Sequence, residues 1–68
     1  MKRLSNHQKM MTGRCAAKEN PVYVNGSFYI EYIALVGGVL IFRGLGSEEE
    51  ALEVAKDAQA NYRRAHGR

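Results

Sequence analysis

The sequence lacks the cysteine pairs that would cross-link a small chain, and it lacks an apolar segment long enough to span a membrane. Cys15 is its only cysteine, which excludes an internal disulfide framework and fits a reducing compartment. The longest apolar run, residues 28–42, is interrupted by Glu31 and two glycines and is shorter than the roughly 18 residues of a membrane span. The basic start of the chain is followed by polar residues, which argues against a secretory signal. These absences predict a cytoplasmic protein without a membrane partner.

Acidic residues are absent from the first 18 positions, although the whole chain of 68 residues contains seven. The cations of this segment are Lys2, Arg3, Lys9, Arg14 and Lys18. Residues 1–20 also lack a sustained hydrophobic period and allow at most one helical turn at residues 8–12. We therefore predict a flexible basic arm over residues 1–20 and a single domain over residues 21–68. With 46% hydrophobic residues, the chain is too apolar to be disordered throughout.

Turn residues divide the domain into strands. Residues 22–24 have strand propensity, and the Asn25-Gly26 pair that follows them is the strongest two-residue hairpin signal. Residues 27–36 are rich in aromatic and β-branched side chains, which favours a second strand. Gly37-Gly38 predicts another turn, and residues 39–43 predict a third strand. Three consecutive antiparallel strands follow from this pattern.

A helix is predicted from about Glu48 to Gly67. Ser47 and Glu50 have the spacing of a capping box, in which the hydroxyl accepts from the Glu50 amide and the carboxylate accepts from the Ser47 amide. One face carries mostly small residues, Ala51, Ala55, Ala58 and Tyr62, with Leu52 and Val54 on its flanks. The predicted fold class is α+β: a three-stranded antiparallel β-meander followed by one C-terminal helix packed on one sheet face.

One helix covers only one face of such a sheet. Alternation in the second strand separates Phe28, Ile30, Tyr32 and Ala34 from Tyr29, Glu31, Ile33 and Leu35, and both sets are largely apolar. A two-residue loop at Gly37-Gly38 pairs Leu35 with Leu40 and Ile33 with Phe42. A three-residue loop with a bulge instead sets Leu40 and Phe42 beside Ala34 and Tyr32. The predicted interface residues are Ile33, Leu35, Val39 and Ile41. The alternative is that the basic arm folds back over this face or that its apolar residues are simply half-buried.

Motifs for catalysis or metal binding are missing. His7, Cys15 and His66 are far apart and form no spaced pair of metal ligands, and the glycines lack the lysine and Ser/Thr of a phosphate loop. The run Glu48-Glu49-Glu50 falls in the first turn of the predicted helix, where acids favour the helix dipole. We predict no cofactor, no metal and no enzymatic activity.

Residues 42–51, Phe-Arg-Gly-Leu-Gly-Ser-Glu-Glu-Glu-Ala, resemble the Apetala-type, ethylene-response-factor-like DNA-binding domain. The likeness extends from Gly26 to Ala58, and related small domains occur in phage homing endonucleases and some integrases. The resemblance implies a sheet that enters the major groove of DNA. By position, the base readers would be Tyr29, Glu31, Ile33, Val39, Ile41 and Arg43. Among these only Arg43 is of the type that reads guanine, and the family has a glycine at its position.

The leading hypothesis is a small non-enzymatic module that binds nucleic acid, and DNA in particular. Cations would contact phosphates and Tyr29 would stack on a base. The predicted nucleic-acid-binding residues are Lys2, Arg3, Lys9, Arg14, Lys18, Tyr29, Arg43, Arg63 and Arg64. The alternative is a protein-interaction module, such as a phage-type regulator or inhibitor, that forms a homodimer or binds a host protein through its apolar sheet face.

Overall fold

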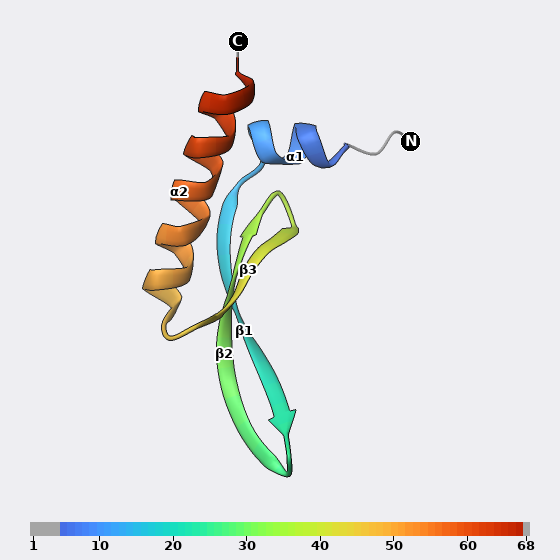
Figure 1. The fold of residues 1–68 in the computed structure, drawn as a ribbon, viewed down its shortest axis with the longest axis vertical. Helices are drawn as coiled ribbons and strands as arrows, with labels where there is room; N and C mark the ends of the chain where they lie inside the picture. Colours follow the sequence, from blue (N-terminus) through green and yellow to red (C-terminus); the bar gives the residue numbers. More distant parts are fainter. Residues whose placement is uncertain (1–4, 68) are drawn as a thin grey trace.

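The computed structural model describes residues 5–67 and contains one sheet and two helices (Figure 1). The elements are α1 (Asn6–Thr12), β1 (Cys15–Val24), β2 (Ser27–Val36), β3 (Val39–Leu45) and α2 (Glu48–His66). The three strands are antiparallel in the order β1-β2-β3, and α2 packs against one face of this sheet. The predicted fold class is therefore confirmed.

Both hairpin turns form as their residues predict. Asn25 and Gly26 have φ angles of 51° and 79°, and Gly37 and Gly38 have φ angles of 59° and 85°. Two successive residues with positive φ are the mark of a type I′ turn, whose twist matches that of the flanking strands. Each turn therefore fixes the register of the residue pairs next to it.

Small side chains form the core between α2 and the sheet. Ala34 and Val36 of β2 meet Ala51 and Ala55 of α2, and all four are fully buried. Alanine side chains let the helix approach the strand backbone closely, but they contribute little apolar volume to the core. The partly buried side chains packed around them are Met10, Cys15, Ala17, Tyr32, Ile41, Leu45 and Val54. The face of β2 that carries Ala34 is thus the one that α2 covers.

β3 departs from the predicted register after its first two pairs. Val36 lies opposite Val39 and Leu35 opposite Leu40, as expected for a two-residue loop. Phe42 then lies opposite Ala34, so the predicted pairing of Ile33 with Phe42 is wrong. The register shifts again before Leu45, next to Gly44 with its φ of 79°. Each shift inserts one residue and changes which side chains face α2.

The two-residue turn at Gly37-Gly38 splits the predicted interface residues between the two faces. Val39 lies opposite the buried Val36, and Ile41 packs against the core, so both belong to the side of α2. Ile33 and Leu35 alternate with the core residues of β2 and lie on the other side. The four residues therefore do not form one surface, because a two-residue turn pairs Val36 with Val39 and so places Val39 and Ile41 on the face of Ala34 and Val36.

The predicted arm is wrong for its described part, residues 5–20. β1 begins at Cys15 rather than near Pro21, and α1 precedes it with a capping box between Ser5 and Gln8. The helix lies beside the C-terminal half of α2 at one end of the sheet (Figure 1). It does not cover the face opposite α2, where Leu40 stays exposed.

One buried side chain fastens this segment to α2. Gln59, 7% exposed, donates from Nε2 to the main-chain oxygens of Met10 at 3.0 Å and Gly13 at 2.7 Å. Its Oε1 accepts from the Cys15 thiol at 3.1 Å. The amide thus satisfies polar groups at the end of α1 and the start of β1 together, which holds α1 against α2.

The start of α2 follows the prediction except for one hydrogen bond. The Ser47 hydroxyl accepts from the Glu50 amide at 3.1 Å, but the Glu50 carboxylate accepts from the Gly46 amide at 3.1 Å instead of the Ser47 amide. At the other end, Gly67 caps the helix by donating to the Arg63 carbonyl. Among the described residues, neither helix has the length and apolar composition needed to cross a bilayer.

The β1–β2 hairpin runs well past the start of α2 (Figure 1). β3 ends at Leu45, opposite Tyr32, so residues 20–30 form a two-stranded ribbon with no third strand beside it. We call residues 20–30 the projecting hairpin. It accounts for the elongated shape of the molecule, whose extents are 46 × 28 × 16 Å.

Candidate nucleic-acid interface

The sheet face away from α2, here called the uncovered face, combines polar and apolar side chains. Lys18 lies opposite Ile33 and Asn20 opposite Glu31 on the two neighbouring strands. Side chains directly opposite in an antiparallel pair point to the same side, so all four share this face. Lys18 is exposed and Ile33 half-buried.

Glu31 is the polar centre of the uncovered face. It is only 6% exposed, and its Oε2 accepts from Asn20 Nδ2 at 2.6 Å and from Arg43 at 2.7 Å. The pKa of this carboxyl is lowered from its usual value by the Asn20 hydrogen bond first, then by Arg43 and by the Gly44 amide, while burial opposes the shift. The carboxylate is therefore ionised at neutral pH and fully occupied within the fold.

Arg43 is held by this carboxylate but remains largely accessible. Its side chain is 60% exposed, and one terminal nitrogen makes the ion pair with Glu31. A guanidinium has five N–H donors, so several are left to meet an oxyanion from solvent. Glu31 fixes where Arg43 points and offsets much of its charge. Sequence reasoning assigned Glu31 as a base reader and missed this positioning role.

Four more of the predicted cations gather at one end of the molecule. Lys9 belongs to α1, Arg14 links α1 to β1, and Arg63 and Arg64 lie in the last turns of α2 beside α1. Arg63 Nε donates to the Met11 carbonyl at 2.8 Å. We call Lys9, Arg14, Arg63 and Arg64 the basic end; residues 5–18 and 58–67 contain no acid. Lys2 and Arg3 lie outside the described residues.

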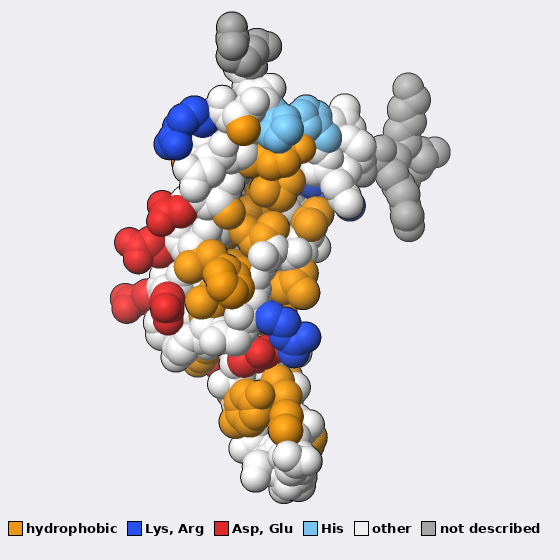
Figure 2. All heavy atoms as spheres, in the orientation of Figure 1, with side chains coloured by type: hydrophobic (Ala, Val, Ile, Leu, Met, Phe, Trp, Pro, Cys, Tyr) orange, Lys and Arg blue, Asp and Glu red, His pale blue; other side chains and the backbone are white. Residues whose placement is uncertain are grey.

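The acidic residues other than Glu31 lie on the side of the molecule that carries α2. Figure 2 shows red side chains along the outer surface of α2, turned away from the sheet. They come from its first half, where Glu48, Glu49 and Glu50 form the first turn, followed by Glu53 and Asp57. Glu19 lies opposite Tyr32 and so also belongs to the side of α2. Glu31, paired with Arg43, is thus the one acid on the uncovered face within the described chain.

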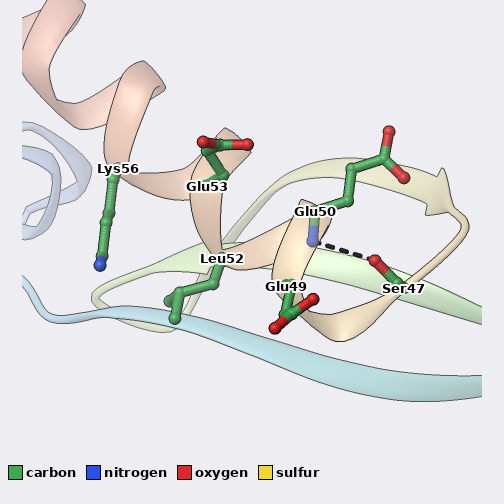
Figure 3. A pocket seen from close by; sticks show the side chains of 6 residues that line it. All are labelled: Ser47, Glu49, Glu50, Leu52, Glu53 and Lys56. Carbon is green, nitrogen blue, oxygen red and sulfur yellow. Dashed lines mark hydrogen bonds between the residues drawn. The ribbon is translucent and has the colours of Figure 1, made fainter.

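A hollow on α2 does not offer a second site. It is open and is lined by Ser47, Glu49, Glu50, Leu52, Glu53 and Lys56, all of which are exposed except the half-buried Leu52 (Figure 3). The carboxylates of Glu50 and Glu53 point away from each other, so they share no common ligand position. Capping and the helix dipole account for these acids.

No metal-binding cluster appears among residues 5–67. No group of three or more His, Cys, Asp or Glu side chains in this part of the chain is arranged to hold a metal ion. His7, Tyr62 and His66 do cluster where α1 meets α2, with His7 Nδ1 2.7 Å from the Tyr62 hydroxyl, but all three serve that contact.

Of the predicted base readers, Tyr29 lies on the uncovered face, whereas Val39 and Ile41 lie on the side of α2. Tyr29 lies opposite Val22 in the projecting hairpin and is half exposed. The structure thus brings Lys18, Tyr29 and Arg43 to one sheet face, with the basic end beyond it. Comparisons with family models, curated proteins and solved structures give no match for this chain.

Proposed function

We propose that the chain is a small nucleic-acid-binding module that contacts phosphates with its uncovered face and basic end. The separation of charge carries this proposal: acids gather on α2, while the uncovered face and basic end present cations. A polyanion approaching the sheet side meets Lys18, Arg43 and Arg14 and stays clear of the acidic helix surface. The resemblance of residues 26–58 to a DNA-binding domain supports the same conclusion.

The contacts are mainly to the phosphate backbone. Ile33 and Leu35 make no hydrogen bonds to base edges, and Arg43 is already bonded to Glu31. Phosphate contacts position a protein on a duplex without reading its sequence. Weak dependence on base sequence and strong dependence on salt are therefore expected.

Fluorescence anisotropy with a labelled duplex, measured over a series of salt concentrations, tests the proposal. The logarithm of the binding constant should fall linearly with the logarithm of salt concentration. Replacing Lys9, Arg14 and Lys18 together by alanine should reduce the slope by about 2 to 3, since each phosphate contact contributes about 0.9.

Lys56→Ala provides the matched control for Lys18→Ala. Both lysines are exposed, but Lys56 lies on α2 among the acids. Lys18→Ala should weaken binding and Lys56→Ala should leave it unchanged. Equal effects of the two variants, or a binding constant that does not change with salt concentration, would contradict the proposal.

A further inference from the structure

The projecting hairpin is apolar on both sides and carries no charge. Residues 20–30 contain no Lys, Arg, Asp or Glu, and Figure 2 shows no red or blue side chain on the visible face of this part. Tyr23 is 76% and Phe28 55% exposed, and their rings lie against each other in a tilted arrangement with centroids 5.1 Å apart. The other large hydrophobic side chains exposed on the hairpin are Val24, Tyr29 and Ile30. An exposed apolar cluster of this size marks an interaction surface.

The whole molecule exposes more surface than a solitary domain of its mass. Its accessible surface is 5265 Å², about 1,000 Å² above the roughly 4,300 Å² expected for a folded monomer of 7.6 kDa. Its radius of gyration is 13.6 Å, against about 11 Å expected for this length. The excess area matches the about 800 Å² that each subunit buries in a standard interface.

The backbone of the projecting hairpin has one open edge with unpaired polar groups. In a two-residue hairpin the residues flanking the turn, Val24 and Ser27, exchange hydrogen bonds, and bonded pairs then alternate along the strands. Tyr29 thus bonds to β1, while Phe28 and Ile30 direct their N–H and C=O groups outward. β3 ends opposite Tyr32, so within the described chain no strand meets these four groups.

The opposite edge, on β1, is protected. By the same alternation Pro21 directs its nitrogen outward, and a proline has no N–H to offer a neighbouring strand. Lys18 and Glu19 add charges along β1. Natural sheets use prolines and charges to keep edges from pairing, and the β2 edge of the hairpin has neither.

We propose that two copies of the chain dimerise by antiparallel pairing of this β2 edge about a two-fold axis at Tyr29. Phe28 of each copy lies opposite Ile30 of the other, and the two pairs form four hydrogen bonds that use all four outward groups. The surface is self-complementary, as a two-fold interface requires. The proposal does not depend on nucleic-acid binding.

The pairing also puts the same face of both copies on one side of the joined sheet. Because the axis is perpendicular to the sheet, the two uncovered faces lie on the same side, with the two Tyr29 rings adjacent. Phe28 and Ile30 of both copies form one apolar strip on the other side. The turn at Asn25-Gly26 of each copy comes beside the end of β3 of the other, at Leu45.

Sedimentation velocity without nucleic acid gives the first test. The wild-type chain should sediment as a dimer, and Phe28→Lys should raise the dissociation constant at least about 30-fold by placing a charge on the edge. Phe42→Lys is the matched control, because Phe42 is also 55% exposed but lies on β3. It should leave the dimer intact.

A cross-link tests the register. The two copies of residue 29 form a non-bonded pair with Cα atoms about 4.5 Å apart, within the range that a disulfide spans. Tyr29→Cys should therefore form a covalent dimer on mild oxidation, whereas the wild type, with Cys15 half-buried, and Phe42→Cys should not. A monomeric wild type, equal effects of the two lysine variants, or no preference for cross-linking at position 29 would each overturn the proposal.

Discussion

Replacing Gln59 by leucine should separate α1 from the rest of the fold. The substitution keeps side-chain size but removes the donor to the Met10 and Gly13 carbonyls and the acceptor for the Cys15 thiol. A net hydrogen bond contributes about 0.5 to 1.5 kcal/mol, and two buried carbonyls are left without partners, so we expect a loss of about 2 to 3 kcal/mol. For a domain of this size that lowers Tm by about 10 to 20 °C.

Circular dichroism at a fixed protein concentration measures this loss, because self-association would make Tm depend on concentration. Asn61→Leu, at an exposed position of the same helix, should change stability by less than about 0.5 kcal/mol. Amide exchange gives a local readout: α1 has seven residues and is too short to persist alone, so the Gly13 amide should lose protection. A Gln59→Leu protein that melts within about 4 °C of the wild type would refute this reasoning.

Two further substitutions test close packing and electrostatics. Gly13→Ala should cost at least about 2 kcal/mol, because its Cβ would lie 2.5 Å from the Gly37 Cα, while Gly46→Ala meets only the Glu50 side chain and should be nearly neutral; urea unfolding of both variants checks the contrast. Because the pKa of Glu31 is lowered from 4.5, its stabilising contribution is fully present above that pH and is lost as the pH falls through the lower pKa of the folded state. Glu31→Gln should therefore flatten the dependence of the urea midpoint on pH below about 4.5, and an unchanged pH profile would show that the carboxylate is not stabilised by the fold.

Local chemistry explains which parts of the fold were predictable. Asn25-Gly26 and Gly37-Gly38 require positive φ and so locate the turns, and Ser47 locates the start of α2. The start of β1 was mispredicted because Pro21 is expected at a strand end, whereas an edge strand tolerates a proline whose nitrogen faces outward. The signal for α1 was present in the Ser5–Gln8 spacing of a capping box, which sequence reasoning passed over.

The candidate site was less predictable because it depends on contacts between distant segments. Alternation in β2 correctly separates Ile33 from Ala34, but the Gly37-Gly38 pair leaves the loop length open, and the two-residue turn is what places Ile41 of β3 on the side of α2. The same irregular strand carries Arg43 to Glu31, whose partner Asn20 lies on β1. Reading Glu31 as a contact residue was reasonable from its position alone. Only the pairing of β2 with both of its neighbouring strands shows that its carboxylate is already occupied.

Small side chains form the core, whereas bulky apolar side chains lie on the projecting hairpin. The largest fully buried side chain is Val36, because the helix face is built from alanines. The bulky residues Tyr23, Phe28 and Ile30 lie instead where α2 does not reach. A 68-residue chain is close to the size at which burial barely offsets lost chain entropy, and here much of the apolar area stays outside the core. Pairing of two hairpins would bury part of that area and satisfy the open edge, so association and folding stability should be coupled in this protein.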